Sequence, residues 1–225
     1  ELWSKHENEH VRRLSSEGIR PLLPWSFKLT DFLDYPQVSK QILTNLNNDE
    51  SLYVRKSVGN HLNDLTKKHA GFVMDLIHSW GSSQEQTSWL IKKGLRTLIK
   101  KGDKRVLEYL GYLNPTMIVV GKVKMTPDKF EIGKETLFSF EILNQSSNEV
   151  PLLIDYIVHY VKKSGLTSAK VFKLKETKLA VNDRLMISKK LVFKQLSTRI
   201  HYPGKHKIEV FVNGEVKAET SFELL

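Results

Sequence analysis

Residues 54–69 read VRKSVGNHLNDLTKKH. Apolar side chains recur in this segment at the three- and four-residue period of an amphipathic helix: Val54, Val58, Leu62 and Leu65. Its basic opening returns at residues 11–13 (VRR) and 91–93 (IKK), at offsets of 43 and 37 positions. Such offsets are typical of HEAT-type helix pairs, which stack because one pair cannot bury its apolar face alone. The sequence therefore predicts an α-α superhelix of HEAT-like repeats over residues 1–115.

The remaining pattern shows where helices give way to strands. Helical spacing predicts helices over residues 2–16, 36–47, 51–67, 70–80, 85–101 and 103–111. After Asn114-Pro115, short alternating runs predict strands over residues 117–125, 135–143, 152–162, 169–175, 186–195, 205–212 and 216–224. Short strands that end in an Asn213-Gly214 hairpin turn are typical of an immunoglobulin-like β-sandwich. We therefore place a domain boundary near residue 115 and a sandwich over residues 116–225.

Composition narrows the class of protein. The 225 residues include no Cys, which excludes disulfides, Cys-ligated metal sites and a Cys nucleophile, and which fits a cytosolic protein. No apolar run approaches the roughly 20 residues that a membrane span needs. Lys and Arg number 35 against 25 Asp and Glu, and the net charge of +10 indicates a polyanionic partner, nucleic acid before an anionic membrane. The charged first residues read as the middle of a helix, so we expect Glu1 to be a truncation point.

Three expected helices carry polar stripes in the same phase relative to the repeated motif. The stripes comprise His6, His10, Arg13 and Glu17; Ser57, His61, Asp64 and Lys68; and Trp89, Lys93, Arg96 and Lys100. Because each helix buries its apolar side, we expect the stripes to be exposed, and stacking would align them into one basic surface for a phosphate backbone. The alternative is that each stripe is an ordinary solvated face.

Two carboxylates are unexpected in a surface that binds a polyanion, because their negative charge opposes binding. Glu17 and Asp64 would repel DNA unless the chemistry needs them. The simpler interpretation is ion pairing within the helices, of Asp64 with Lys68 and of Glu17 with Arg13 or Arg20.

One short motif matches a metal-binding signature, but its residues do not support a metal site. Residues 6–10 read HENEH and match the zinc-protease signature H-E-x-x-H. The middle positions of such helices normally pack against a core, whereas here they are Asn8 and Glu9. No third ligand motif follows, so we treat the match as a coincidence and expect no metal site.

Longer motifs are more specific. Residues 6–25, 54–69 and 96–103 closely resemble AlkC-type DNA alkylation repair proteins, which are HEAT-repeat alkylpurine DNA glycosylases of the AlkC/AlkD superfamily. The resemblance covers the helical half, and one branch of these proteins carries a C-terminal immunoglobulin-like domain. It implies a monofunctional glycosylase that removes cationic alkylated bases, such as 3-methyladenine and 3-methylcytosine, from duplex DNA in base excision repair without flipping the base. By carry-over the active-site residues would be Glu17, Trp25 and Asp64, with a further acidic residue before Glu1.

The chemistry implied is the cleavage of an N-glycosidic bond. Alkylation makes the base a good leaving group, and the bond breaks through an oxocarbenium-like sugar. Asp64 would stabilise that sugar and orient water with help from Glu17, while the face of Trp25 contacts the deoxyribose. Two alternatives stay open: Trp25 as an anchor in the core, and a non-catalytic scaffold that binds DNA or an acidic protein.

Basic side chains and one tryptophan make up the DNA contacts that we expect. In the helical half these are Arg13, Arg20, Arg55, Lys56, His61, Lys68, Trp89, Lys93, Arg96 and Lys100. Residues 160–207 hold 13 Lys and Arg and only two acids, Glu176 and Asp183, which favours a second DNA clamp that includes Lys189 and Lys190 over a merely solubilising surface. We expect a monomer of the bacterial cytoplasm that binds duplex DNA, no membrane and no cofactor.

Overall fold

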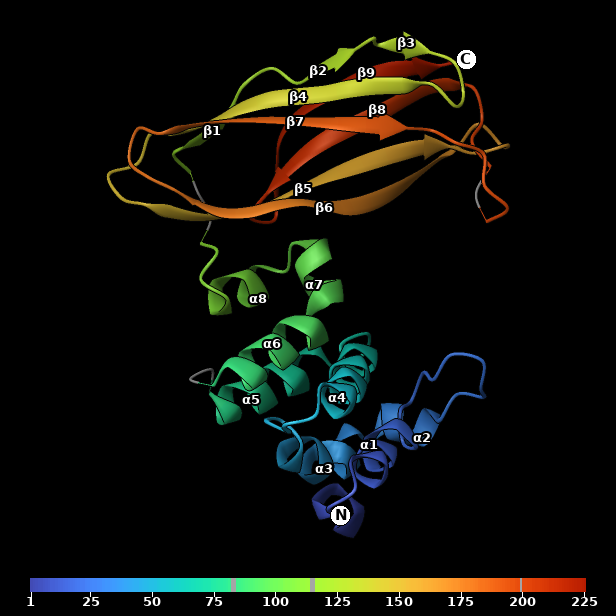
Figure 1. Ribbon diagram of the computed structural model, residues 1–225, viewed down its shortest axis with the longest axis vertical. Helices are drawn as coiled ribbons and strands as arrows, with labels where there is room; N and C mark the ends of the chain where they lie inside the picture. Colours follow the sequence, from blue (N-terminus) through green and yellow to red (C-terminus); the bar gives the residue numbers. More distant parts are fainter. Residues whose placement is uncertain (82–83, 114–115, 199) are drawn as a thin grey trace. The chain divides into compact units, whose positions relative to one another are not determined.

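The computed structural model describes residues 1–81, 84–113, 116–198 and 200–225. The chain divides into two compact units, Glu1–Val106 and Leu107–Leu225. The boundary predicted at Asn114-Pro115 lies outside the described residues, so the domain limits drawn there stay a prediction. The predicted order of a helical region followed by an immunoglobulin-like β-sandwich is confirmed (Figure 1).

The helical unit consists of short helices. Its elements are η1 (Leu2–Lys5), α1 (Glu9–Glu17), α2 (Thr30–Asp34), η2 (Pro36–Ser39), α3 (Lys40–Asn45), α4 (Leu52–Leu65), α5 (Ala70–Trp80), α6 (Glu85–Gly94) and α7 (Arg96–Lys101), and α8 (Lys104–Tyr109) crosses into the second unit. The single helix predicted over residues 2–16 is wrong, because the Asn8 side chain accepts a hydrogen bond from the His10 backbone N–H and caps a new helix there. The helix predicted over 85–101 breaks at Leu95, and α2 was not predicted.

The core of this unit forms around α4. Val54, Val58, Leu62 and Leu65, the apolar positions of the repeated motif, are all fully buried. Helix α4 packs against α1 and against α6. Gly94 lets α6 approach closely, since a Cβ there would lie 2.9 Å from the Leu62 Cβ. Among the three helices that carry the repeated motif, α4 is therefore the neighbour of both α1 and α6, while the HEAT type of the repeat stays a prediction.

The second unit is a sandwich of two sheets. Its strands are β1 (Ile118–Val120), β2 (Lys124–Thr126), β3 (Lys129–Phe130), β4 (Glu135–Asn144), β5 (Val150–Val161), β6 (Thr167–Leu179), β7 (Arg184–Val192), β8 (Gly204–Val212) and β9 (Glu215–Leu224). In one sheet β4 pairs with β1, β2 and β7, and the other has the order β3-β9-β8-β5-β6. The predicted strand 117–125 is split into β1 and β2, which pair with different parts of β4. Alternation along β4 places Phe138, Phe140 and Ile142 in the core.

The segment that leads into the sandwich is held by it. The side-chain amide of Asn213 donates to the carbonyl oxygen of Leu113 at 3.1 Å, and the Tyr112 hydroxyl donates to the Glu176 carboxylate. These contacts explain why the second unit begins at Leu107, before its first strand.

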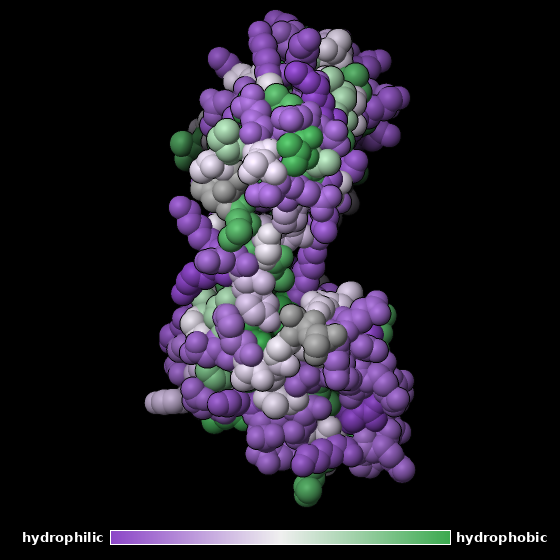
Figure 2. Space-filling model, turned by 90° about the vertical axis from the view of Figure 1, so that its left-hand side faces the viewer, coloured by the Kyte–Doolittle hydropathy of each residue, from purple (hydrophilic) through white to green (hydrophobic). Residues whose placement is uncertain are grey.

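The surface is mostly hydrophilic. On the face shown in Figure 2, apolar residues form small separate patches among polar ones. Within the described part of the chain, no helix has the length and apolar character that crossing a bilayer requires.

Candidate active site

Two helix ends bring the predicted catalytic carboxylates together. Glu17 is the last residue of α1, which ends when the Gly18 N–H bonds back to the Leu14 carbonyl. A turn follows, in which the Arg20 N–H donates to the Glu17 carbonyl at 3.2 Å. Asp64 lies in the last turn of α4, and α4 packs directly against α1. The turn after α1 therefore places Arg20 between the two acids.

The Arg20 guanidinium bridges both carboxylates. Its Nη1 lies 2.7 Å from the Glu17 Oε1, and its Nε and Nη2 each lie 3.1 Å from the Asp64 Oδ2. Glu17 also accepts a 2.6 Å hydrogen bond from the Ser57 hydroxyl, and the Arg13 Nη2 lies 3.6 Å from its Oε2. Arg20 and Asp64 are only 6% and 4% exposed. The result is a nearly buried ionic network that joins α1, α4 and the turn between α1 and α2.

The predicted exposure of the second stripe is wrong for Ser57, His61 and Asp64 and right for Lys68. Ser57, His61 and Asp64 are buried because α1 covers this face of α4. His61 is fully buried, with its Nδ1 3.2 Å from the Ser16 carbonyl oxygen, so the basis for a direct DNA contact there is lost. Arg20, another expected DNA contact, is likewise buried and engaged by the two acids.

The predicted pairing of the carboxylates is confirmed for Glu17 and wrong for Asp64. Glu17 contacts both Arg13 and Arg20, as expected. Lys68 instead pairs with Asp34, and the i,i+3 neighbour Lys67 lies 3.8 Å from the Asp64 Oδ1. The strong partner of Asp64 is Arg20, which is 44 positions away in the sequence.

The two acids differ in proton affinity. Burial favours the neutral form of Glu17, but hydrogen bonds from Ser57 and Arg20 outweigh it and hold the pKa of Glu17 below its usual range. Burial dominates at Asp64 and raises its pKa, although Arg20, Lys67 and Arg96 oppose the rise. Burial also lowers the pKa of His61 to about 4, so its ring is neutral at physiological pH. The site therefore holds one strongly acidic carboxyl and one of higher pKa.

Trp25 is presented to solvent. Its side chain is fully exposed, so the alternative of a core anchor is wrong. It lies on the loop between α1 and α2, which is closed by a 3.0 Å hydrogen bond from the Leu29 N–H to the Pro21 carbonyl. Trp25 has a φ of 65°, a conformation that costs energy for a bulky residue. Phe27, which the sequence reading missed, is 79% exposed on the same loop. The one feature of the sequence that could have indicated Phe27 is its position two residues after Trp25.

Cations and aromatic rings alternate on the helices beside this site. The Arg13 guanidinium lies 4.5 Å from the ring centre of Tyr53. The sequence did not single out Tyr53. The Arg55 and Lys93 cations lie 5.8 and 5.7 Å from the Trp89 ring centre. Arg96 donates at 2.7 Å to the Lys93 carbonyl at the end of α6. Of the other expected contacts, the exposed ones are Lys56, Lys68 and Lys100.

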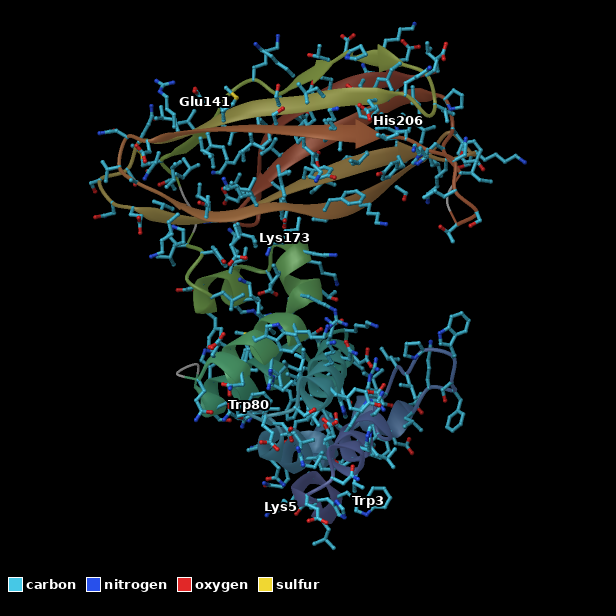
Figure 3. The ribbon with its side chains drawn as sticks, viewed as in Figure 1. Trp3, Lys5, Trp80, Glu141, Lys173 and His206 are labelled. Carbon is cyan, nitrogen blue, oxygen red and sulfur yellow. The ribbon has the colours of Figure 1, made fainter. Side chains whose placement is uncertain are left out.

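The sandwich residues singled out as a clamp have different environments. Lys190 is exposed, and its Nζ lies 3.3 Å from the Glu135 Oε2. Lys189 is half-buried on the strand face shared by the buried Ile187 and Leu191. Other cations of the sandwich also pair with acids: the Arg184 Nη1 on β7 lies 2.9 Å from the Oε2 of Glu141 on β4. Figure 3 labels Glu141. A clamp by this unit stays a proposal.

The HENEH motif does not form the helix of a zinc protease. His6 lies before α1, where its Nδ1 accepts from the Asn8 N–H at 3.0 Å, whereas His10 is inside the helix. Among the described residues, no group of three His, Asp or Glu side chains is arranged to hold a metal ion.

Comparison with known proteins covers both units. Residues 119–225 match the family model of the "Uncharacterised protein YhaZ, C-terminal Ig-like domain". The "Uncharacterized protein YhaZ" of Bacillus subtilis (strain 168) is 41% identical over 222 residues, which are 99% of this chain and 62% of that protein. Pseudomonas fluorescens alkylpurine DNA glycosylase AlkC, solved bound to DNA containing an abasic site analog, superposes with a TM-score of 0.96 at 41% identity.

That superposition covers 100% of this chain and 62% of the AlkC chain. The chain thus spans less than two thirds of the length of both relatives. Over its whole length it is similar to AlkC, and the resemblance to AlkC-type proteins that the sequence predicts is confirmed.

Proposed function

We propose that this chain carries catalytic residues of a DNA glycosylase that excises cationic N-alkylated bases from duplex DNA. The observation that carries the proposal is the pairing of Glu17 and Asp64 on one guanidinium, in a chain that is similar throughout to an alkylpurine DNA glycosylase. Carboxylates are suited to a reaction in which positive charge develops on the sugar.

Asp64 is the group that stabilises the sugar cation. Arg20 occupies its Oδ2, whereas among the described residues the polar partner of its Oδ1 is the Lys67 ammonium at 3.8 Å. The Oδ1 is therefore the oxygen available to the oxocarbenium-like sugar and to the attacking water. Glu17 is held ionised by Ser57 and Arg20, and it adds negative charge beside Asp64.

We infer that Trp25 supplies an aromatic surface for the nucleotide. Its exposed ring can lie against the deoxyribose and attract the cationic nucleotide through its π-face. We infer that 3-methyladenine and 3-methylcytosine are removed without base flipping, and that their own lability provides much of the selectivity. None of the proposed catalytic residues is a Schiff-base lysine, so we expect base release without strand nicking.

Cations around the site hold the duplex in place. Arg13, Arg55, Lys56, Lys68, Lys93, Arg96 and Lys100 contact phosphates in this proposal, with Trp89 packed among them. The sandwich acts as a second clamp through exposed lysines such as Lys190.

The test is base release by the full-length protein with Asp64→Asn. We expect excision of 3-methyladenine from methylated duplex DNA to be nearly abolished, while DNA affinity stays the same or increases because a carboxylate is removed. Asp75→Asn, at an exposed position on α5, is the matched control and retains activity. Excision by Asp64→Asn at the normal rate would show that Asp64 is not the catalytic group. A chelator added to the wild-type reaction is expected to leave base release unchanged.

A non-catalytic scaffold is the second candidate. Its support is that Arg20 bridges both acids, as it would in a purely structural ion network. Binding of alkylated duplex DNA with no base release by the full-length wild-type protein would favour this function.

A further inference from the structure

The Arg20 side chain is the centre of the carboxylate network. Its three guanidinium nitrogens contact two acids that come from different helices. We propose that Arg20 is a positioning residue of the glycosylase site, which orients Asp64 and Glu17 and keeps Asp64 anionic before DNA binds. This inference rests on the proposed function, because it assigns Asp64 the catalytic role.

The geometry of the Arg20 guanidinium decides which oxygen of the Asp64 carboxylate it leaves uncontacted. A guanidinium is planar and directs its donors along fixed lines, so it can hold two carboxylates at a set angle. Nε and Nη2 together engage the Asp64 Oδ2 at 3.1 Å, which leaves the Oδ1 away from Arg20. A lysine at position 20 would keep the charge, but its single ammonium could not hold both acids in this orientation.

Charge is the second part of the argument. The ionisable groups that act on the Asp64 carboxyl come from the turn after α1, from the end of α4 and from α7: Arg20, Lys67 and Arg96. Glu17 contacts the same guanidinium, and His61 lies three positions before Asp64 on α4. Among these, Lys67 is half-exposed and distant at 3.8 Å, and burial keeps His61 neutral by lowering its pKa to about 4. Arg20 is the close and buried cation, so it opposes most directly the burial that raises the pKa of Asp64.

Helix α1 also offers a matched structural ion pair. The Arg12 Nε lies 2.7 Å from the Asp49 Oδ2, and both side chains are largely buried. Arg12 donates to neither Glu17 nor Asp64; its partners are Asp49, the backbone carbonyls of His6 and Glu7, and the exposed Glu50 carboxylate at 3.7 Å. Loss of a buried arginine can therefore be compared with and without a link to the proposed catalytic acids.

The experiment compares full-length wild type with Arg20→Met, Arg20→Lys and Arg12→Met. One readout is single-turnover excision of 3-methyladenine as a function of pH. The other is the titration of the Asp64 carboxyl by carbon-13 NMR, assigned with Asp64→Asn. In Arg20→Met we expect the pKa of Asp64 to rise by about one pH unit or more, and the acidic limb of the excision profile to move up with it. The loss of rate is therefore larger at low pH than at high pH.

The lysine variant separates charge from orientation. Arg20→Lys keeps a cation, so its acidic limb stays near that of wild type, but its rate falls by roughly tenfold to a hundredfold because the fork is lost. Arg12→Met lowers the melting temperature and leaves the acidic limb in place. If Arg20→Met does not fold, a wild-type excision rate in Arg20→Lys overturns the proposal.

The outcomes distinguish this inference from the proposed function. An Asp64 titration that is the same in Arg20→Met as in wild type overturns the role of Arg20, even if the wild type excises bases. Absence of base release by the wild type overturns the glycosylase function instead. In that case, a raised pKa of Asp64 in Arg20→Met still supports the inference that Arg20 keeps Asp64 anionic.

Discussion

The ion pairs of the proposed active site and those of the proposed clamp lie in different environments. In the helical unit, Arg20, Glu17 and Asp64 form a network that is largely removed from water. In the sandwich, pairs such as Lys190–Glu135 and Arg184–Glu141 lie at the surface. Water screens surface pairs, whereas buried ones change the pKa and orientation of their members. The buried network is the place of the proposed chemistry, whereas phosphate binding by the sandwich stays a proposal.

The largest stability difference is expected between a buried and an exposed ion pair. Arg12→Met leaves Asp49 buried without its partner, and we expect it to lower the free energy of unfolding by about 3 kcal/mol. Lys190→Met removes an exposed partner of Glu135 and should change it by less than about 1 kcal/mol. Urea unfolding of each variant measures both values. An equal loss of unfolding free energy in the two variants would contradict the distinction between buried and exposed ion pairs.

A pH effect of similar size is expected from His61. Because burial lowers its pKa from 6.5 to about 4, the unfolded chain binds this proton more tightly than the folded chain does. The stabilisation is complete above about pH 6.5 and is lost as the pH falls toward 4, to a total of roughly 3 kcal/mol at most. Unfolding measured across this range should depend less on pH in His61→Leu. The exposed His10→Gln control should keep the wild-type slope, and the same slope in all three proteins would contradict the prediction.

The smallest effect concerns the sandwich surface. Reversing the charge of Lys189 and Lys190 to Glu should weaken binding to any duplex a few-fold and flatten the dependence of affinity on salt. Lys190 should account for most of the change because Lys189 is half-buried. Binding titrations at several salt concentrations, with unmodified and alkylated duplexes, measure it. Unchanged affinity would remove these two lysines from the proposed clamp.

The order of the fold was predictable because it depends on local periodicity. Apolar residues three and four positions apart can share one buried face only in a helix, and all four such positions in α4 are buried. Alternation likewise predicted most of the long strands. The short strand β3 was missed, since its two residues are too few to show a period.

The acids of the site were identified from residue motifs, yet their environment was not. Sequence alone singled out Glu17, Trp25 and Asp64, because motif resemblance needs only the order of residues. It could not show that α1 covers Ser57, His61 and Asp64, since burial of a polar face depends on which helix packs there. Nor could it join Arg20 to Asp64 across 44 positions. Residue order determined most of the helices, the long strands and the candidate acids. Only tertiary packing decided which charges are removed from water, and thereby which of them are paired.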